Sequence, residues 1–158
     1  LLKSKKVVLP VDVVVGRGTR NGERVVSVSS VTGVRPARNA SKLACVAGGS
    51  SEAIYDIGPQ TIRLYAKYIK QAQTIVWNGA MGYFEQKPYD VGTLSIARLV
   101  ASRSKGKAFG IIGGGETLQA MEKVKMMEYV DLVSTGGGAM LEFLAGKNLP
   151  GVKVVSKK

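Results

Sequence analysis

Three glycine-rich segments are the residues of this sequence whose pattern points most directly to chemistry. They are residues 78–82 (NGAMG), 113–117 (GGGET) and 134–138 (STGGG). Glycines between a strand and a helix let backbone N–H groups approach an anion, and the helix N-terminus adds its dipole. We therefore expect two of these loops to hold two phosphates or a transferring phosphoryl group. The competing interpretation is that glycine only permits tight turns.

Two carboxylates next to these segments are candidates for nucleotide contacts. Glu116 directly follows a glycine run, where an acid can hold a Mg²⁺ that bridges nucleotide phosphates. An acid is also simply favourable at a helix start, so a structural explanation remains open. Glu85 follows Tyr83 and Phe84 after the first segment, and it is either an acceptor for ribose hydroxyls or a solvated surface acid.

The elements that must position these residues alternate between strand and helix. The apolar patterns predict strands at residues 74–77, 108–112 and 130–133, with a last strand at 152–155. They predict helices from Gly58 and Pro59 onward, after a capping Thr93, and at 117–125 and 139–145. Such alternation predicts an α/β fold, a parallel sheet with helices on both faces. The three loops should then converge at the carboxyl ends of the strands.

The first third of the chain has a different pattern. Residues 7–15 are an apolar, β-branched run typical of a buried strand, with a break or an edge at Pro10. Residues 25–28 suit a short strand, and residues 16–52 as a whole are expected to form a divergent irregular excursion.

Composition excludes several function classes. The 158 residues contain no histidine, which excludes a His-dependent catalytic triad or zinc site. No apolar run is long enough to span a membrane. The single cysteine, Cys45, excludes an internal disulfide, and we expect a cytoplasmic protein.

The charge balance favours an anionic partner. Lys and Arg number 23 against 11 acidic residues, a net charge of +12, and residues 1–50 alone carry 9 basic and 2 acidic side chains. A basic nucleic-acid-binding module is therefore the alternative function. It is the less favoured one, because we find no paired aromatic residues on a strand and no zinc motif.

Five segments in family order resemble phosphoglycerate kinase. Residues 75–85 (IVWNGAMGYFE) look like V-W-N-G-P-x-G-x-F-E, and residues 112–117 (IGGGET) resemble I-G-G-G-D-[ST]. Residues 134–144 (STGGGAMLEFL) are similar to S-T-G-G-G-A-x-L-E-x-L, and residues 9–15 and 56–62 resemble two further family segments. The resemblance implies that residues 1–158 are the latter part of a C-terminal, Rossmann-like nucleotide-binding domain in a two-domain kinase.

That resemblance also implies an activity and residue roles. The family transfers a phosphoryl group between 1,3-bisphosphoglycerate and Mg-ADP, so the implied cofactors are ATP or ADP and Mg²⁺. By analogy the backbone N–H groups of Gly136, Gly137 and Gly138 bind the transferring phosphoryl, Glu85 binds the ribose, and Glu116 also meets the magnesium. The implied nucleotide-binding residues are Asn78, Gly79, Glu85, Gly113, Gly114, Gly115, Glu116 and Thr117.

The sequence departs from the family pattern in ways that bear on activity. It has no match to the family's N-terminal domain, with its basic patch for 3-phosphoglycerate, or to its lysine-bearing G-G-A-K-V-x-D-K motif. Ala80 replaces the usual Pro, and Glu116 replaces the commoner Asp. We therefore expect the chain to be inactive alone, with the missing N-terminal domain as its partner, and the full-length protein to be a monomer.

Overall fold

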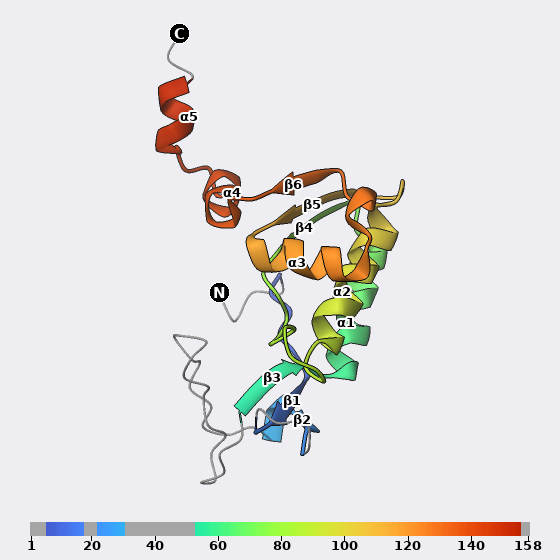
Figure 1. Cartoon of the computed structure of the whole chain (residues 1–158). Helices are drawn as coiled ribbons and strands as arrows, with labels where there is room; N and C mark the ends of the chain where they lie inside the picture. The colour runs from blue at the N-terminus through green and yellow to red at the C-terminus, as the bar shows by residue number, and fades with distance from the viewer. Residues whose placement is uncertain (1–5, 18–21, 31–52, 156–158) are drawn as a thin grey trace. The chain divides into compact units, whose positions relative to one another are not determined.

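The computed structural model describes residues 6–17, 22–30 and 53–155 (Figure 1). The chain divides into two compact units, which are described separately. Unit 1 comprises Leu1–Tyr68 and Met81–Ile96, and unit 2 comprises Ile69–Ala80 and Ala97–Lys158. The helices α1 (Pro59–Gln71) and α2 (Val91–Ser104) contribute residues to both units.

Unit 1 contains an antiparallel sheet in the order β2-β1-β3. Its strands are β1 (Asp12–Gly16), β2 (Arg24–Ser27) and β3 (Ala53–Ile57), and a 3-10 turn, η1 (Val28–Ser30), follows β2. Tyr55 and Tyr89 stack in its core with ring centroids 4.3 Å apart. Each residue of β1 except Gly16 faces one on β2, as in the pair Val13 and Val26.

The antiparallel pairing of β1 distinguishes its sheet from the parallel alternation that the sequence predicts for the later part of the chain. A β-branched run favours a strand but does not specify the direction of its neighbour. The connection from β1 to β2 spans only residues 17–23, shorter than the dozen or so residues that a parallel crossover needs. The strand also begins after Pro10 rather than at residue 7, in agreement with the predicted break there.

Two buried aspartates of unit 1 cap helices from neighbouring strands. Asp12 on β1 accepts hydrogen bonds from the backbone N–H groups of Gln60 (2.9 Å) and Thr61 (2.7 Å) at the start of α1. Asp56 on β3 accepts one from Gly92 (2.6 Å) at the start of α2, and one from Ile57 (2.8 Å). Both carboxylates therefore supply acceptors that helix N-termini lack within the helix.

Unit 2 contains the parallel sheet that the alternation predicts, in the order β4-β5-β6. Its strands are β4 (Thr74–Asn78), β5 (Phe109–Gly113) and β6 (Leu132–Ser134). The helices that follow β5 and β6 are α3 (Gly115–Val124) and α4 (Gly137–Leu144), with the 3-10 turn η2 (Met127–Tyr129) after α3. Figure 1 shows α3 running along one side of this sheet. The α/β class is confirmed.

The two faces of this sheet differ in burial. Ile75, Trp77 and Ile112 are buried on one face. Val76 and Leu132 both align with Ile111 and therefore lie on the opposite face. Their side chains are 42% and 51% exposed. In the part of the chain that the structure describes, helices therefore shield one face of the sheet better than the other.

Two local predictions are wrong. Residues 152–155 belong to a short helix, α5 (Pro150–Val155), and not to a strand; Pro is well suited to the first position of a helix. Thr93 does not cap α2, which begins two residues earlier. Instead its buried hydroxyl accepts hydrogen bonds from the N–H groups of Met81 (3.0 Å) and Gly82 (3.3 Å).

Several expectations concern residues that the structure does not describe. Most of the predicted excursion at residues 16–52, including Cys45, lies outside the described residues. Within the described ranges, no helix combines the length and apolarity needed to cross a bilayer.

Candidate functional site

The three glycine-rich loops converge at one edge of the sheet of unit 2. Asn78 at the end of β4 aligns with Gly113 at the end of β5, and Gly113 aligns with Ser134 at the end of β6. Each strand therefore enters its loop at the same level of the sheet. The predicted convergence is confirmed, and it places Asn78, Gly79, Gly113–Gly115 and Gly136–Gly138 together.

Three hydrogen bonds connect the loops to one another. The side-chain Nδ2 of Asn78 donates to the carbonyl oxygen of Gly137 (3.0 Å). The N–H of Gly79 donates to the hydroxyl oxygen of Thr117 (2.7 Å). The N–H of Gly114 donates to the carbonyl oxygen of Ser134 (3.1 Å). The three loops are thus one hydrogen-bonded assembly.

The glycines of the two triplets stand in different surroundings. Gly114 has a φ of 88°, and a Cβ there would lie 2.7 Å from Oδ1 of Asn78. A Cβ on Gly113 would meet the side chain of Met140. In contrast, a Cβ on Gly115 or Gly138 would have open space around it. Leaving aside the chain neighbours and the backbone of the same helix, no atom would lie within 4 Å of it. Packing thus explains some of these glycines, while Gly115 and Gly138 leave open space above the loops.

Two helix N-termini open into this edge without side-chain caps. The N-cap residues of α3 and α4 are Gly114 and Gly136, and neither helix has a capping side-chain hydrogen bond. The first N–H groups of an α-helix have no acceptor within the helix. Together with the helix dipole, they attract an anion to this edge of the sheet.

Glu116 is the acid of this edge. It is exposed in the first turn of α3. The described residues contain no group of three or more His, Cys, Asp or Glu side chains that could hold a metal ion by themselves. A single exposed carboxylate suits Mg²⁺, which is commonly held by one or two carboxylates together with substrate phosphates and water. The donor set therefore fits a nucleotide-bound magnesium.

Thr117 and Glu85 differ from the other predicted site residues in burial and in the unit to which they belong. Thr117 is completely buried, and its hydroxyl is occupied by the N–H of Gly79. Glu85 is exposed and belongs to unit 1, whereas all the other predicted site residues belong to unit 2.

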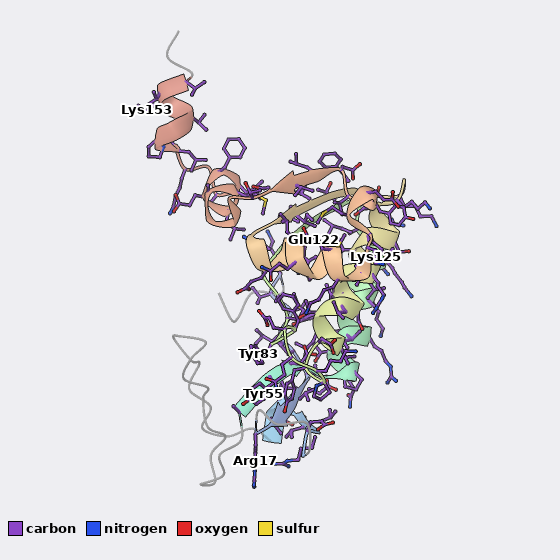
Figure 2. All side chains as sticks on the ribbon, in the orientation of Figure 1. Arg17, Tyr55, Tyr83, Glu122, Lys125 and Lys153 are labelled. Carbon is purple, nitrogen blue, oxygen red and sulfur yellow. The ribbon has the colours of Figure 1, made fainter. Side chains whose placement is uncertain are left out.

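Sequence reasoning missed the residues that hold the segment before Glu85 in place. The N–H of Tyr83 donates to the carbonyl oxygen of Tyr55 (2.7 Å), and the centroids of the two rings lie 6.2 Å apart (Figure 2). Thr93 holds the preceding two residues through its hydroxyl. The sequence signal that could have indicated this arrangement was Asp56, an acid in an otherwise apolar segment. Asp56 caps α2, the helix that carries Thr93.

Comparisons with known proteins give a consistent result. The family model described as phosphoglycerate kinase matches residues 2–147. A phosphoglycerate kinase of Coxiella burnetii is 47% identical over 109 residues, which are 69% of this chain and 27% of that protein.

Solved structures agree with the family match. A phosphoglycerate kinase structure from Coxiella burnetii matches 95% of this chain and 34% of its own, with a TM-score of 0.71 and 39% identity. A phosphoglycerate kinase structure from Pyrococcus horikoshii OT3 matches 91% of this chain and 31% of its own, with a TM-score of 0.65 and 30% identity. The chain therefore spans about a third or less of the length of these relatives. Because the family model covers nearly all of its residues, and fold and sequence both agree with it, the chain belongs to the phosphoglycerate kinase family.

Proposed function

We propose that this chain supplies the nucleotide-phosphate-binding part of a phosphoglycerate kinase. The whole enzyme would transfer a phosphoryl group between 1,3-bisphosphoglycerate and Mg-ADP. One observation supports the role of this chain above all: three glycine loops and two uncapped helix N-termini meet at one sheet edge in a chain of this family.

The arrangement suits phosphoryl transfer because that reaction depends on positioning and charge stabilisation rather than on a covalent nucleophile. The backbone N–H groups of Gly136, Gly137 and Gly138 would stabilise the transferring phosphoryl group. Gly113, Gly114 and Gly115 would face the nucleotide phosphates. A chain without histidine can do this, since backbone donors need no titratable side chain.

The remaining site residues would complete the nucleotide contacts. Glu116 would hold the magnesium, which neutralises charge on phosphate oxygens when it is bound. Glu85 would accept hydrogen bonds from the ribose hydroxyls. The backbone N–H of Thr117, in the uncapped first turn of α3, would face the nucleotide phosphates. Asn78 and Gly79 would line the same pocket, and the bonds that Asn78 and Gly79 make within the protein hold the loops together.

The proposal includes a partner. The phosphoglycerate substrate would be bound by a further domain, because this chain spans only 27% of the length of its Coxiella burnetii relative. We also propose that the full-length protein is a cytoplasmic monomer.

Calorimetric titration of Mg-ADP into the 158-residue chain tests the proposal, with Gly138→Ala as the informative variant. A methyl group at residue 138 fits without contact but intrudes on the open surface above α4. We expect binding by the natural chain and an affinity loss of about fivefold or more in the variant, because close approach of an anion to helix N–H groups is hindered.

Gly151→Ala is the matched control, because Gly151 is also the second residue of a helix and a methyl group there would likewise meet no atom within 4 Å. Its Mg-ADP affinity should equal that of the natural chain. Failure of the natural chain to bind Mg-ADP, or equal weakening by both variants, would refute the proposed site.

A further inference from the structure

We infer that the exposed face of α1 is a docking surface for the phosphate backbone of a nucleic-acid duplex, which it binds without sequence specificity. Three exposed residues form this face, Arg63, Lys67 and Lys70, and we call them the basic stripe. The inference goes beyond the proposed function, because the basic stripe belongs to none of the glycine loops and does not depend on nucleotide binding.

Helical spacing brings the three basic side chains to one side of α1. Residues 63, 67 and 70 follow the i, i+4, i+7 pattern, so they share one face of a helix with about 3.6 residues per turn. Thr61, on the opposite side of the helix, is completely buried. The basic stripe therefore faces away from the packed side of α1, and it extends for about 10 Å along the helix axis.

No acidic residue of α1 balances these charges. The 13 residues of the helix include neither Asp nor Glu. The side chains of the basic stripe form no ion pair with any residue that the structure describes. Asp12 does contact α1, but its buried carboxylate accepts the backbone N–H groups of Gln60 and Thr61. The positive charge of this face is thus left to solvent or to a partner.

Such a face is unfavourable for the helix by itself. Arg63 and Lys67 are four residues apart, and Lys67 and Lys70 are three apart, so like charges repel each other on neighbouring turns. The helix dipole favours a cation only in the last turn, where Lys70 stands. A face that is merely solvated ordinarily carries charges of both signs. A bound polyanion would turn this repulsion into attraction.

The spacing of the charges suits a nucleic-acid backbone. One strand of a duplex presents a phosphate about every 3.4 Å along its axis, so about three phosphates lie within the length of the basic stripe. A small anion cannot contact all three side chains at once. Lys and Arg bind phosphates without an aromatic platform, so the lack of paired aromatic residues on a predicted strand does not oppose this contact. The net charge of +12 would attract a polyanion to the chain.

The test compares the natural 158-residue chain with two triple variants. The stripe variant combines Arg63→Gln, Lys67→Gln and Lys70→Gln. The control variant removes the same charge from exposed residues on three other parts of the chain, and it combines Lys107→Gln, Lys125→Gln and Lys153→Gln. Gln is nearly as favourable in a helix as Lys or Arg. Fluorescence anisotropy would measure the affinity of each protein for a short labelled DNA duplex of random sequence at several salt concentrations.

We expect the natural chain to bind the duplex with an affinity that falls steeply as salt rises. The stripe variant should bind about tenfold more weakly or worse, and its plot of log affinity against log salt should be shallower by about 2–3, since each lost phosphate contact removes about one unit of slope. The control variant should keep nearly the natural slope. Two duplexes of different sequence should bind equally.

Absence of duplex binding by the natural chain, or equal changes of slope in the two triple variants, would overturn the inference. Displacement of the duplex by Mg-ADP at constant ionic strength would overturn it too, because the phosphates would then lie at the glycine loops. Should the stripe variant fail to fold, Lys67→Gln alone should lower the slope by about one unit. If the natural chain binds the duplex but not Mg-ADP, the proposed function fails and the basic stripe stands.

Discussion

At the scale of single residues, the glycines of a triplet are not equivalent. Gly114 combines a φ of 88° with the close approach of Asn78, whereas Gly115 has neither constraint. The sequence suggested two explanations for such runs, phosphate binding and tight turns. The structure gives a packing reason for Gly113, Gly114 and Gly137, and it leaves Gly115 and Gly138 without one.

Gly114→Ala and Gly115→Ala should therefore differ in stability. Alanine at residue 114 is strained by the positive φ and collides with Asn78, so we expect the free energy of unfolding to fall by about 1–3 kcal/mol. Alanine at residue 115 favours the first turn of α3 and should change it by no more than about 0.5 kcal/mol. Urea denaturation of both variants measures the difference, and equal stabilities would contradict the assigned packing roles.

At the scale of elements, the two aspartate caps have opposite protonation behaviour. Burial alone would raise the pKa of Asp12, but hydrogen bonds from the hydroxyl of Thr61 and from backbone N–H groups outweigh it and keep the pKa below 3.8. Burial raises the pKa of Asp56 to about 6, and the nearby Asp90 acts in the same direction, although two backbone N–H groups partly offset this. The ionisation of Asp56 therefore opposes folding.

The effect of Asp56 on stability should depend on pH. Its pKa is about 6 in the folded chain and 3.8 ordinarily, so the folded state binds more protons between these values. The contribution of Asp56 to the free energy of unfolding therefore falls as pH rises from about 4 to about 7, by on the order of 3 kcal/mol. Relative to the natural chain, Asp56→Asn should gain stability across this range.

Urea denaturation of the natural chain and Asp56→Asn at several pH values measures this change. Glu122→Gln is the control, because Glu122 is an exposed acid on α3, and its stability relative to the natural chain should stay nearly constant. A constant difference between Asp56→Asn and the natural chain from pH 4 to 7 would be inconsistent with an elevated pKa.

The element pattern of unit 2 could be predicted from sequence, because strand and helix alternate with clear apolar periodicity from β4 to α4. The pairing of β1 could not, since its apolar run suits either strand direction. The helix α5 was misread because Val152, Val154 and Val155 favour strands. That preference acts through packing, and Val154 and Val155 are 75% and 82% exposed in the structure.

The convergence of the three loops was predictable for the same reason as the sheet, since consecutive parallel strands bring their following loops to one edge. What the loops do to each other was not predictable. The bond from Asn78 to Gly137 joins residues 59 positions apart, and no local pattern encodes such a contact. The helix caps at Asp12 and Asp56 could not be predicted from sequence either. Both residues are distant in sequence from the helix that they cap, whereas capping rules describe residues next to a helix.

At the scale of the whole molecule, the excess of basic residues is greatest in residues 1–50, which carry 9 basic and 2 acidic side chains. The three glycine-rich segments contain no Lys or Arg. The loop edge of unit 2 instead offers backbone N–H groups of α3 and α4. The net charge of +12 is therefore a poor guide to the anion-binding site, although it first suggested an anionic ligand.

The chain alone should bind nucleotide without turning over substrate. It contains no match to the family's 3-phosphoglycerate patch or lysine motif and spans 27% of the length of its Coxiella burnetii relative. Phosphoryl transfer requires donor and acceptor to be held in line. A coupled assay with 3-phosphoglycerate and Mg-ATP should show no rate above background, while a full-length phosphoglycerate kinase serves as positive control. A rate comparable to that control would contradict the expectation.

The single tryptophan, Trp77, is an intrinsic fluorescent probe near the end of β4. Trp77 is 5% exposed, and its indole Nε1 has no hydrogen-bond partner among the described residues. A buried indole of this kind emits at a shorter wavelength than an exposed one, because burial limits its contact with solvent. Asn78 is the next residue in the chain. The emission wavelength of the natural protein therefore reports directly on the integrity of β4 and of the glycine loop that follows it, with no added label.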